Sequence, residues 1–248
     1  MEWRDEGIIL GVRRHGETSA IVEVMTRGHG RHLGLVRGGR SRRQQPVLQP
    51  GNRVELAWRA RLDEHLGQFA VEPLDLIAGR LMESACAIHG VQTLAAHLRL
   101  IPERDPHPRL FETLALVLDH LAEPLSGAEL VARFELMVLD ELGFGLDLAE
   151  CAATGGRADL AYVSPKTGRA VSRLAGEPWA DRLLPLPAFL DFAAGRRADA
   201  NSVVDAFRLT GHFLTRHVWG ARGVEEPETR RSYIASVVRS TSRGDAAA

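Results

Sequence analysis

The first third of the chain consists of short apolar runs with a period of two. Ile8, Leu10 and Val12 alternate with Ile9, Gly11 and Arg13. Four further runs follow, at residues 20–25, 32–36, 54–58 and 66–76, and Gly-rich or Pro-Gly turns separate them. This alternation is typical of β-strands. Five short strands within the first eighty residues favour a small closed barrel, because closure leaves no sheet edge exposed.

An OB-fold is the commonest five-stranded barrel of this size, and we expect it over residues 1–79. A small SH3-like barrel is compatible with the same strand pattern. The sequence therefore predicts an N-terminal β-barrel domain, and the two barrel types remain open on the pattern alone.

From residue 80 onward the apolar period changes to that of helices. Leu81, Ala85 and Ile88 begin a stripe at spacings of three and four, and similar stripes run through 111–121 and 130–142. The Ser126-x-x-Glu129 pattern has the form of a capping box and predicts the start of the third helix. A long final helix is expected to begin near Asn201 or Ser202.

The whole chain is thus predicted to be an α+β protein, with the barrel followed by a mainly α-helical domain at 80–223. Residues 146–178 interrupt the helices, and we interpret them as a small irregular β-hairpin with its turn at 165–168. A short helix is expected around Phe189 and Phe192. Residues 224–248 lose periodicity and end in Gly-Asp-Ala-Ala-Ala, so we expect a flexible C-terminal tail.

Charge is distributed unevenly along the chain, although the formal net charge is only -1. Residues 1–80 hold 13 Arg against 10 acidic residues, whereas the remainder holds 18 basic residues against 22 acidic ones. Lys166 is the single lysine, so nearly every cation is an arginine, which forks onto phosphates and stays charged. A basic surface is therefore expected on the barrel.

The strongest local feature is the segment from Arg27 to Arg43, which contains no acidic residue. Interleaved glycines would let the backbone approach a phosphate chain closely. Arg59 and Arg61 follow on the next strand. The predicted DNA-binding residues are Arg27, Arg31, Arg37, Arg40, Arg42, Arg43, Arg59 and Arg61. A solvated basic loop without a ligand is the alternative interpretation.

Trp58 lies beside Arg59, where an aromatic ring could stack on a base, but an inward strand position would place it in the core. The other candidate sites are weak. The chain has no Gly-rich phosphate loop followed by Lys and Ser or Thr, and no Gly-x-Ser-x-Gly elbow. The patterns therefore predict a protein that is not an enzyme.

The order of these features resembles the RecO DNA repair proteins. The match is carried by residues 3–18, 28–39, 135–147, 162–172, 184–190 and 207–217, including Tyr-Val-Ser-Pro-Lys-Thr-Gly-Arg-Ala-Val-Ser and Leu-Pro-Leu-Pro-Ala-Phe-Leu. The resemblance implies an OB-fold that binds single- and double-stranded DNA, anneals complementary strands and helps to load RecA. It also implies RecR, in some lineages RecF, and the C-terminal tail of single-strand-binding protein as partners. For that tail, Arg133 and Arg208 are candidate residues because they lie beside apolar helix stripes, and plain surface arginines are the alternative interpretation.

Many relatives in this family hold zinc with four cysteines in the insert, and here the chain departs from the pattern. Cys151 stands where the first ligand would be, but Thr154, Ser172 and Ala175 occupy or lie near the other positions. One thiolate cannot build a tetrahedral structural site. We therefore expect no zinc and no other cofactor, and we expect packing of Leu160, Tyr162 and Val171 to hold the insert.

Two cysteines are too few for a disulfide scaffold, and no run approaches the length of a membrane span. The expected location is the cytoplasm, at the bacterial nucleoid, with no membrane partner. Two alternatives to a DNA-binding mediator remain. One is an OB-fold module that binds RNA or acts mainly as a protein-interaction adaptor, and the other is a hydrolytic enzyme, which the missing constellations disfavour.

Overall fold

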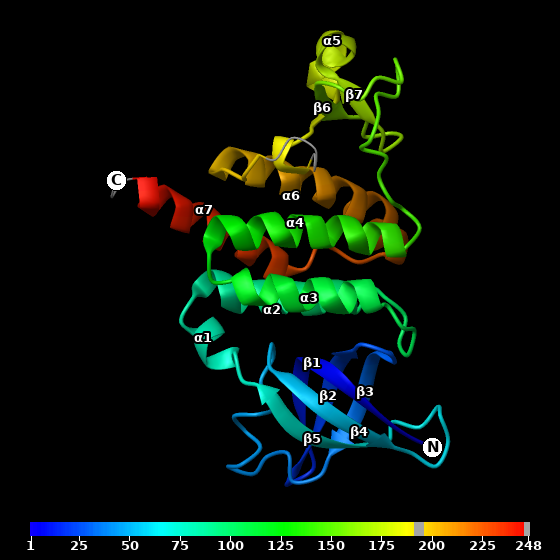
Figure 1. The fold of residues 1–248 in the computed structure, drawn as a ribbon, viewed down its shortest axis with the longest axis vertical. Helices are drawn as coiled ribbons and strands as arrows, with labels where there is room; N and C mark the ends of the chain where they lie inside the picture. The colour runs from blue at the N-terminus through cyan, green and yellow to red at the C-terminus, as the bar shows by residue number, and fades with distance from the viewer. Residues whose placement is uncertain (191–195, 246–248) are drawn as a thin grey trace. The chain divides into compact units, whose positions relative to one another are not determined.

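The computed structural model describes residues 1–190 and 196–245, with side chains in the last helix described through Ser242. The chain forms two compact units, 1–122 and 123–248, and each is described by itself. Both the strands and the helices expected from the sequence are present, which confirms the α+β class (Figure 1).

The first unit contains a closed five-stranded barrel. Its strands are β1 (Glu2–His15), β2 (Ser19–Thr26), β3 (Gly30–Val36), β4 (Arg53–Arg59) and β5 (Gln68–Asp75). They close in the order β1-β2-β3-β5-β4, with β3 and β5 parallel and the other neighbours antiparallel. This arrangement is consistent with an OB-fold. Strand β1 is long enough to pair with β4 through its first half and with β2 through its second half.

The barrel interior is filled by the inward residues of the alternating runs. Val22, Val24, Val54 and Leu56 are completely buried. Trp58 is also completely buried, and its indole N–H donates to the Leu66 carbonyl oxygen at 3.1 Å. Trp58 is therefore a core residue rather than a platform for a base.

A segment beyond the barrel completes its wall. Strands β3 and β5 pair only at Leu35 and Gln68. Near the start of β3, Arg31 instead forms a parallel bridge with Glu103, and its carbonyl oxygen accepts from the Arg104 N–H at 2.9 Å. The Arg104 guanidinium also donates to carbonyl oxygens of the β4–β5 loop, including that of His65 at 2.9 Å. Residues 103–104 thus occupy an edge that β5 leaves open.

Three helices complete the first unit: α1 (Ala78–Met82), α2 (Ala85–Leu98) and α3 (Pro108–His120). In Figure 1, α2 and α3 lie across one side of the barrel. Ion pairs join them and the adjoining loop to the strands: Glu23–Arg99 at 2.7 Å, Arg27–Glu112 at 3.0 Å and Arg53–Asp119 at 2.8 Å. The compact unit therefore runs past the expected boundary at residue 79, to residue 122.

The main helices of the second unit are α4 (Pro124–Glu141), α6 (Ala200–Leu214) and α7 (Glu228–Asp245). A short π-helix, η3 (Thr215–Trp219), and a 3-10 helix, η4 (Gly220–Arg222), follow α6. The predicted capping box at Ser126 is wrong, because α4 begins earlier, at Pro124, with Glu123 as its N-cap residue. Asp199 caps α6 and forms a capping box with Ser202.

Residues 224–248 were expected to be a flexible tail, and this expectation is wrong for 228–245, which form α7. Tyr233 and Val237, four positions apart, are buried. The helix is otherwise strongly polar, so its narrow apolar stripe did not stand out in the sequence.

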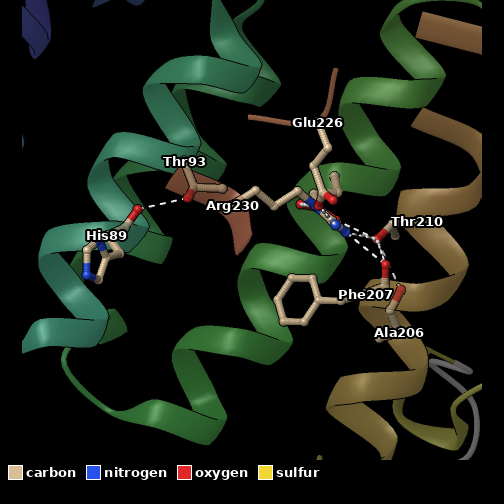
Figure 2. A network of polar contacts seen from close by, with 8 residues as sticks. His89, Thr93, Ala206, Phe207, Thr210, Glu226 and Arg230 are labelled. Atoms are coloured by element: carbon tan, nitrogen blue, oxygen red, sulfur yellow. Dashed lines mark hydrogen bonds and ion pairs between the residues drawn. The ribbon is translucent and has the colours of Figure 1, made fainter. Parts of the chain in front are cut away.

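A buried ion pair joins the helices of this unit. The Arg230 Nε atom of α7 lies 2.7 Å from the Glu135 Oε1 atom of α4, and the two side chains are 3 % and 0 % exposed. Figure 2 shows the Arg230 guanidinium aimed at Thr210 and the Phe207 carbonyl oxygen of α6. Burial by itself would lower the pKa of Arg230, but attraction to Glu135 and the hydrogen bonds that Arg230 donates to Glu135 and Glu226 outweigh it and raise the pKa. Removing one partner of such a pair typically costs about 3–5 kcal/mol.

The insert forms a small three-stranded sheet, ordered β7-β6-β8. Its elements are β6 (Leu160–Val163), β7 (Ala170–Ser172), α5 (Arg173–Gly176), η1 (Glu177–Arg182), β8 (Leu184–Pro185) and η2 (Ala188–Leu190). The predicted hairpin is therefore present. Leu160, Tyr162 and Val171, which were expected to hold the insert by packing, are only partly buried. The buried residues are instead Val163, Ala170 and Leu184. Phe192 lies outside the described residues.

The contact between the barrel and residues 103–105 predicts a specific sensitivity at Gly30. Gly30 has φ +64°, and an added Cβ would overlap the Asp105 backbone. Gly16 has a similar φ of +58° with nothing near the Cβ position. Gly16→Ala should cost about 1–2 kcal/mol for the left-handed backbone, and Gly30→Ala about 1–3 kcal/mol more for the overlap. Urea unfolding of both variants measures the difference, and equal losses would show that 103–105 do not press on the barrel.

Candidate nucleic-acid interface

An open groove lies at one end of the barrel, between the β1–β2 turn and the long β3–β4 loop. Strand register brings these segments together, because Ala20 pairs with both Arg14 and Val36. The groove has a volume of about 610 Å³. It is lined by Val12, Arg14, Glu17, Thr18, Ala20, Gly38, Gly39, Arg40, Ser41, Gln45, Leu48, Gln49 and Pro50.

Arg40 fastens the β3–β4 loop to the β1–β2 turn. Its Nη1 atom donates to the Glu17 carbonyl oxygen at 2.5 Å and to the Gly16 carbonyl oxygen at 3.2 Å. Its backbone N–H donates to the Thr18 carbonyl oxygen at 3.0 Å. Arg40 thus shapes the groove, and its remaining guanidinium N–H groups are available to a ligand because the residue is exposed.

Arg37, Arg42 and Arg43 are exposed at the same end of the barrel. Within the described part of the chain, none of the three makes an ion pair with a carboxylate. Arg14 also faces the groove, and the sequence analysis did not select it. The signal was available in the run Arg13–Arg14 at the end of the first strand, because a hairpin places that end beside the start of β2, which pairs in turn with the last residues of β3.

Three of the other predicted DNA-binding arginines form ion pairs with carboxylates. Arg31 is only 9 % exposed and pairs with Glu23 at 2.9 Å and Glu103 at 3.3 Å, so the structure places it inside the protein.

Arg27 pairs with Glu112 and lies over the Phe111 ring, 4.9 Å from its centroid. Arg59 pairs with Glu2 at 2.9 Å, and this hydrogen bond lowers the pKa of Glu2. These positions carry little unpaired positive charge.

Arg61 lies apart from the groove, in the β4–β5 loop. None of the groove's lining residues comes from this loop. Asp63 and Glu64 lie two and three positions after Arg61, so the loop carries more negative than positive charge. Arg61 is consequently a weaker candidate than the arginines of the β3–β4 loop.

Both histidines of the basic segment belong to an aromatic cluster with Trp3. The His29 ring stacks on Trp3 with centroids 4.1 Å apart, and its Nδ1 atom lies 2.8 Å from Asp5 Oδ2. His32 packs edge-on against Trp3 and Trp58, and burial lowers its pKa. These histidines are engaged in contacts within the barrel, and His32 is buried.

The insert does not fit a zinc ion. Around Cys151 the neighbouring groups are hydroxyl and amide groups: the sulfur lies 3.4 Å from Ser172 Oγ and accepts from the Ser172 N–H at 3.3 Å. These bonds, with one from Thr154, lower the pKa of the thiol. Hydroxyls are not the thiolate or imidazole donors that structural zinc requires. Across the residues that could be searched, no group of three or more His, Cys, Asp or Glu side chains could hold a metal ion.

Of the two candidates for a partner's tail, Arg133 is engaged within its own unit. It pairs with Glu129 at 2.9 Å and lies over the Phe189 ring. Arg208 is exposed on α6.

The described helices include none that is long and apolar enough to span a membrane.

Comparison with known proteins agrees with the architecture. The family model for the recombination protein O N terminal region matches residues 1–77, and that for its C terminal region matches residues 85–223. Similar curated proteins carry the name DNA repair protein RecO. The one from Mesorhizobium japonicum is 67 % identical over 96 % of this chain and 94 % of its own length.

The protein of that name from Chelativorans sp. is 66 % identical over 100 % of both chains. The one from Brucella abortus is 61 % identical over 96 % of this chain and 97 % of its own. Both domain models match this chain, and the relatives at this level of identity share one name. The chain belongs to the RecO family of DNA repair proteins.

Proposed function

We propose that the chain is a non-enzymatic recombination mediator that binds single- and double-stranded DNA through the groove end of its barrel. One observation carries the proposal: Arg14 and Arg40 line the open groove, and Arg37, Arg42 and Arg43, which flank its lining residues 38–41 in sequence, are exposed and pair with no carboxylate in the described part of the chain. Unpaired arginines at an accessible surface neutralise phosphates and release counterions, which supplies most of the affinity for a nucleic-acid backbone.

The same electrostatics account for strand annealing. A strand bound along the arginines loses part of its charge, so a second strand approaches with less repulsion and at a raised local concentration. Complementary bases then pair without any covalent step. This proposal requires no catalytic group or nucleotide cofactor.

The proposed cellular role follows the family. It includes annealing of complementary strands and loading of RecA onto DNA coated by single-strand-binding protein, in association with the nucleoid. The proposed partners are RecR, RecF in some lineages, and the C-terminal tail of single-strand-binding protein. The name shared by the relatives, DNA repair protein RecO, supports this role.

The first prediction concerns the unpaired arginines. Replacing Arg37, Arg42 and Arg43 together with Ala should remove about three phosphate contacts from single-stranded DNA. The slope of log K against log salt should fall by about two units, at ~0.7 per contact. Fluorescence anisotropy of a labelled oligonucleotide at several salt concentrations measures this slope.

The matched control replaces Arg27, Arg59 and Arg80 with Ala. These arginines are exposed but paired with carboxylates in the same unit. It changes the net charge equally and should leave the slope nearly unaltered. Equal effects of the two triple variants would show that only net charge matters. An unchanged slope in the first variant would move the DNA surface elsewhere, and tighter binding of RNA than of DNA would favour the RNA-binding alternative.

The second prediction concerns metal. Because the insert offers a single thiolate, the purified protein should contain far less than one zinc per chain, and chelation should not change its unfolding midpoint. Cys151→Ser should behave like the parent protein in both measurements. If plasma emission analysis returned about one zinc per chain, and this zinc were lost in Cys151→Ser, the prediction that the insert holds no zinc would be overturned.

A further inference from the structure

A second cationic groove lies in the unit formed by residues 123–248. It has a volume of about 630 Å³. Its lining residues are Phe207, Arg208, Gly211, His212, Thr215, Arg216, Glu226 and Arg230. Most of them come from α6 and its extension η3, and two come from the N-terminal part of α7 and the residues before it.

Three basic side chains of this groove share one helix face. Arg208, His212 and Arg216 are four positions apart, a spacing that places side chains one above another. The Pro165 carbonyl oxygen accepts from Arg216 Nη1 at 2.9 Å and lies 3.0 Å from His212 Nε2. These bonds hold the β6–β7 turn against the helix.

The unbalanced charge of the groove is positive. Glu226 is the carboxylate among its lining residues, and it is already ion-paired with Arg230. Gly211 leaves the floor open, since a Cβ there would sit 3.1 Å from the Arg230 guanidinium. The excess of acidic residues after residue 80 therefore does not extend to this face.

The lining also indicates which kind of anion the groove accepts. Its one large apolar residue, Phe207, is only 3 % exposed, so an acidic peptide with apolar side chains would find no apolar surface. A phosphodiester backbone needs only cations and hydrogen-bond donors, and arginines provide both.

We propose that this groove binds the phosphate backbone of a second DNA strand, with Arg208 and Arg216 as its main contacts. The inference deepens the proposed function, because annealing requires that one molecule hold two strands. The barrel groove binds one strand, and the α6 groove binds the other.

The experiment measures bridging by the full-length protein. Two oligothymidylates, one with a donor dye and one with an acceptor dye, cannot pair with each other, so energy transfer reports a protein that holds both. The double change Arg208→Ala and Arg216→Ala should abolish this transfer, with affinity for the second strand reduced roughly tenfold or more. Anisotropy should show that the first strand still binds as it does to the parent protein.

The matched control is the double change Arg173→Ala and Arg231→Ala, which removes two exposed arginines that pair with Asp159 and Glu228 in the same unit. It should retain bridging. Circular dichroism establishes that all variants are folded, and light scattering at the assay concentration establishes whether bridging requires a protein dimer.

Unchanged bridging in the double variant Arg208→Ala and Arg216→Ala would overturn the inference. The second strand would then be held by a protein dimer or by another surface. Unchanged bridging together with lost binding of a fluorescent hexa-aspartate peptide would assign the groove to an acidic polypeptide instead. The barrel variant that lacks Arg37, Arg42 and Arg43 separates the two proposals. If it binds the first strand normally, the proposed function fails, whereas the α6 variant tests only the second site.

Discussion

The ion pairs between the barrel and residues 99–119 determine which arginines of the basic segment can meet a ligand. Glu23 holds both Arg31 and Arg99, and Glu103 adds a second partner to Arg31. Arg27 is held by Glu112 in the same way. Because a carboxylate at this distance neutralises the arginine locally, docking of the helices divides a uniform basic sequence into two populations.

The second population lies at the groove end of the barrel. No helix of the first unit supplies a residue to this groove, so its arginines keep their full charge. Arg40 connects the groove to the barrel fold, because its bonds to the β1–β2 turn determine where the β3–β4 loop begins. The shape of the groove therefore depends on hydrogen bonds to the backbone. Its arginines keep their positive charge because the helices whose acids neutralise other arginines cover other faces of the barrel.

Much of the fold was predictable because period-two and helical stripes report burial directly. The five strands, the helices and the insert hairpin all come from such local patterns. The partition of the arginines was not predictable, because it depends on acids such as Glu103 and Glu112, which lie 72 and 85 positions from their partners. Helix α7 was missed because its buried stripe, around Tyr233 and Val237, is narrow within a polar segment.

The central claim is that the barrel and residues 80–122 form one folding unit. Thermal unfolding of two fragments, 1–79 and 1–122, tests it most directly. We expect a single cooperative transition for 1–122 and a much less stable or unfolded 1–79, because the shorter fragment lacks the residues that close β3 and pair with Glu23 and Arg27. A fragment 1–79 that unfolds cooperatively at the same temperature as 1–122 would contradict the account.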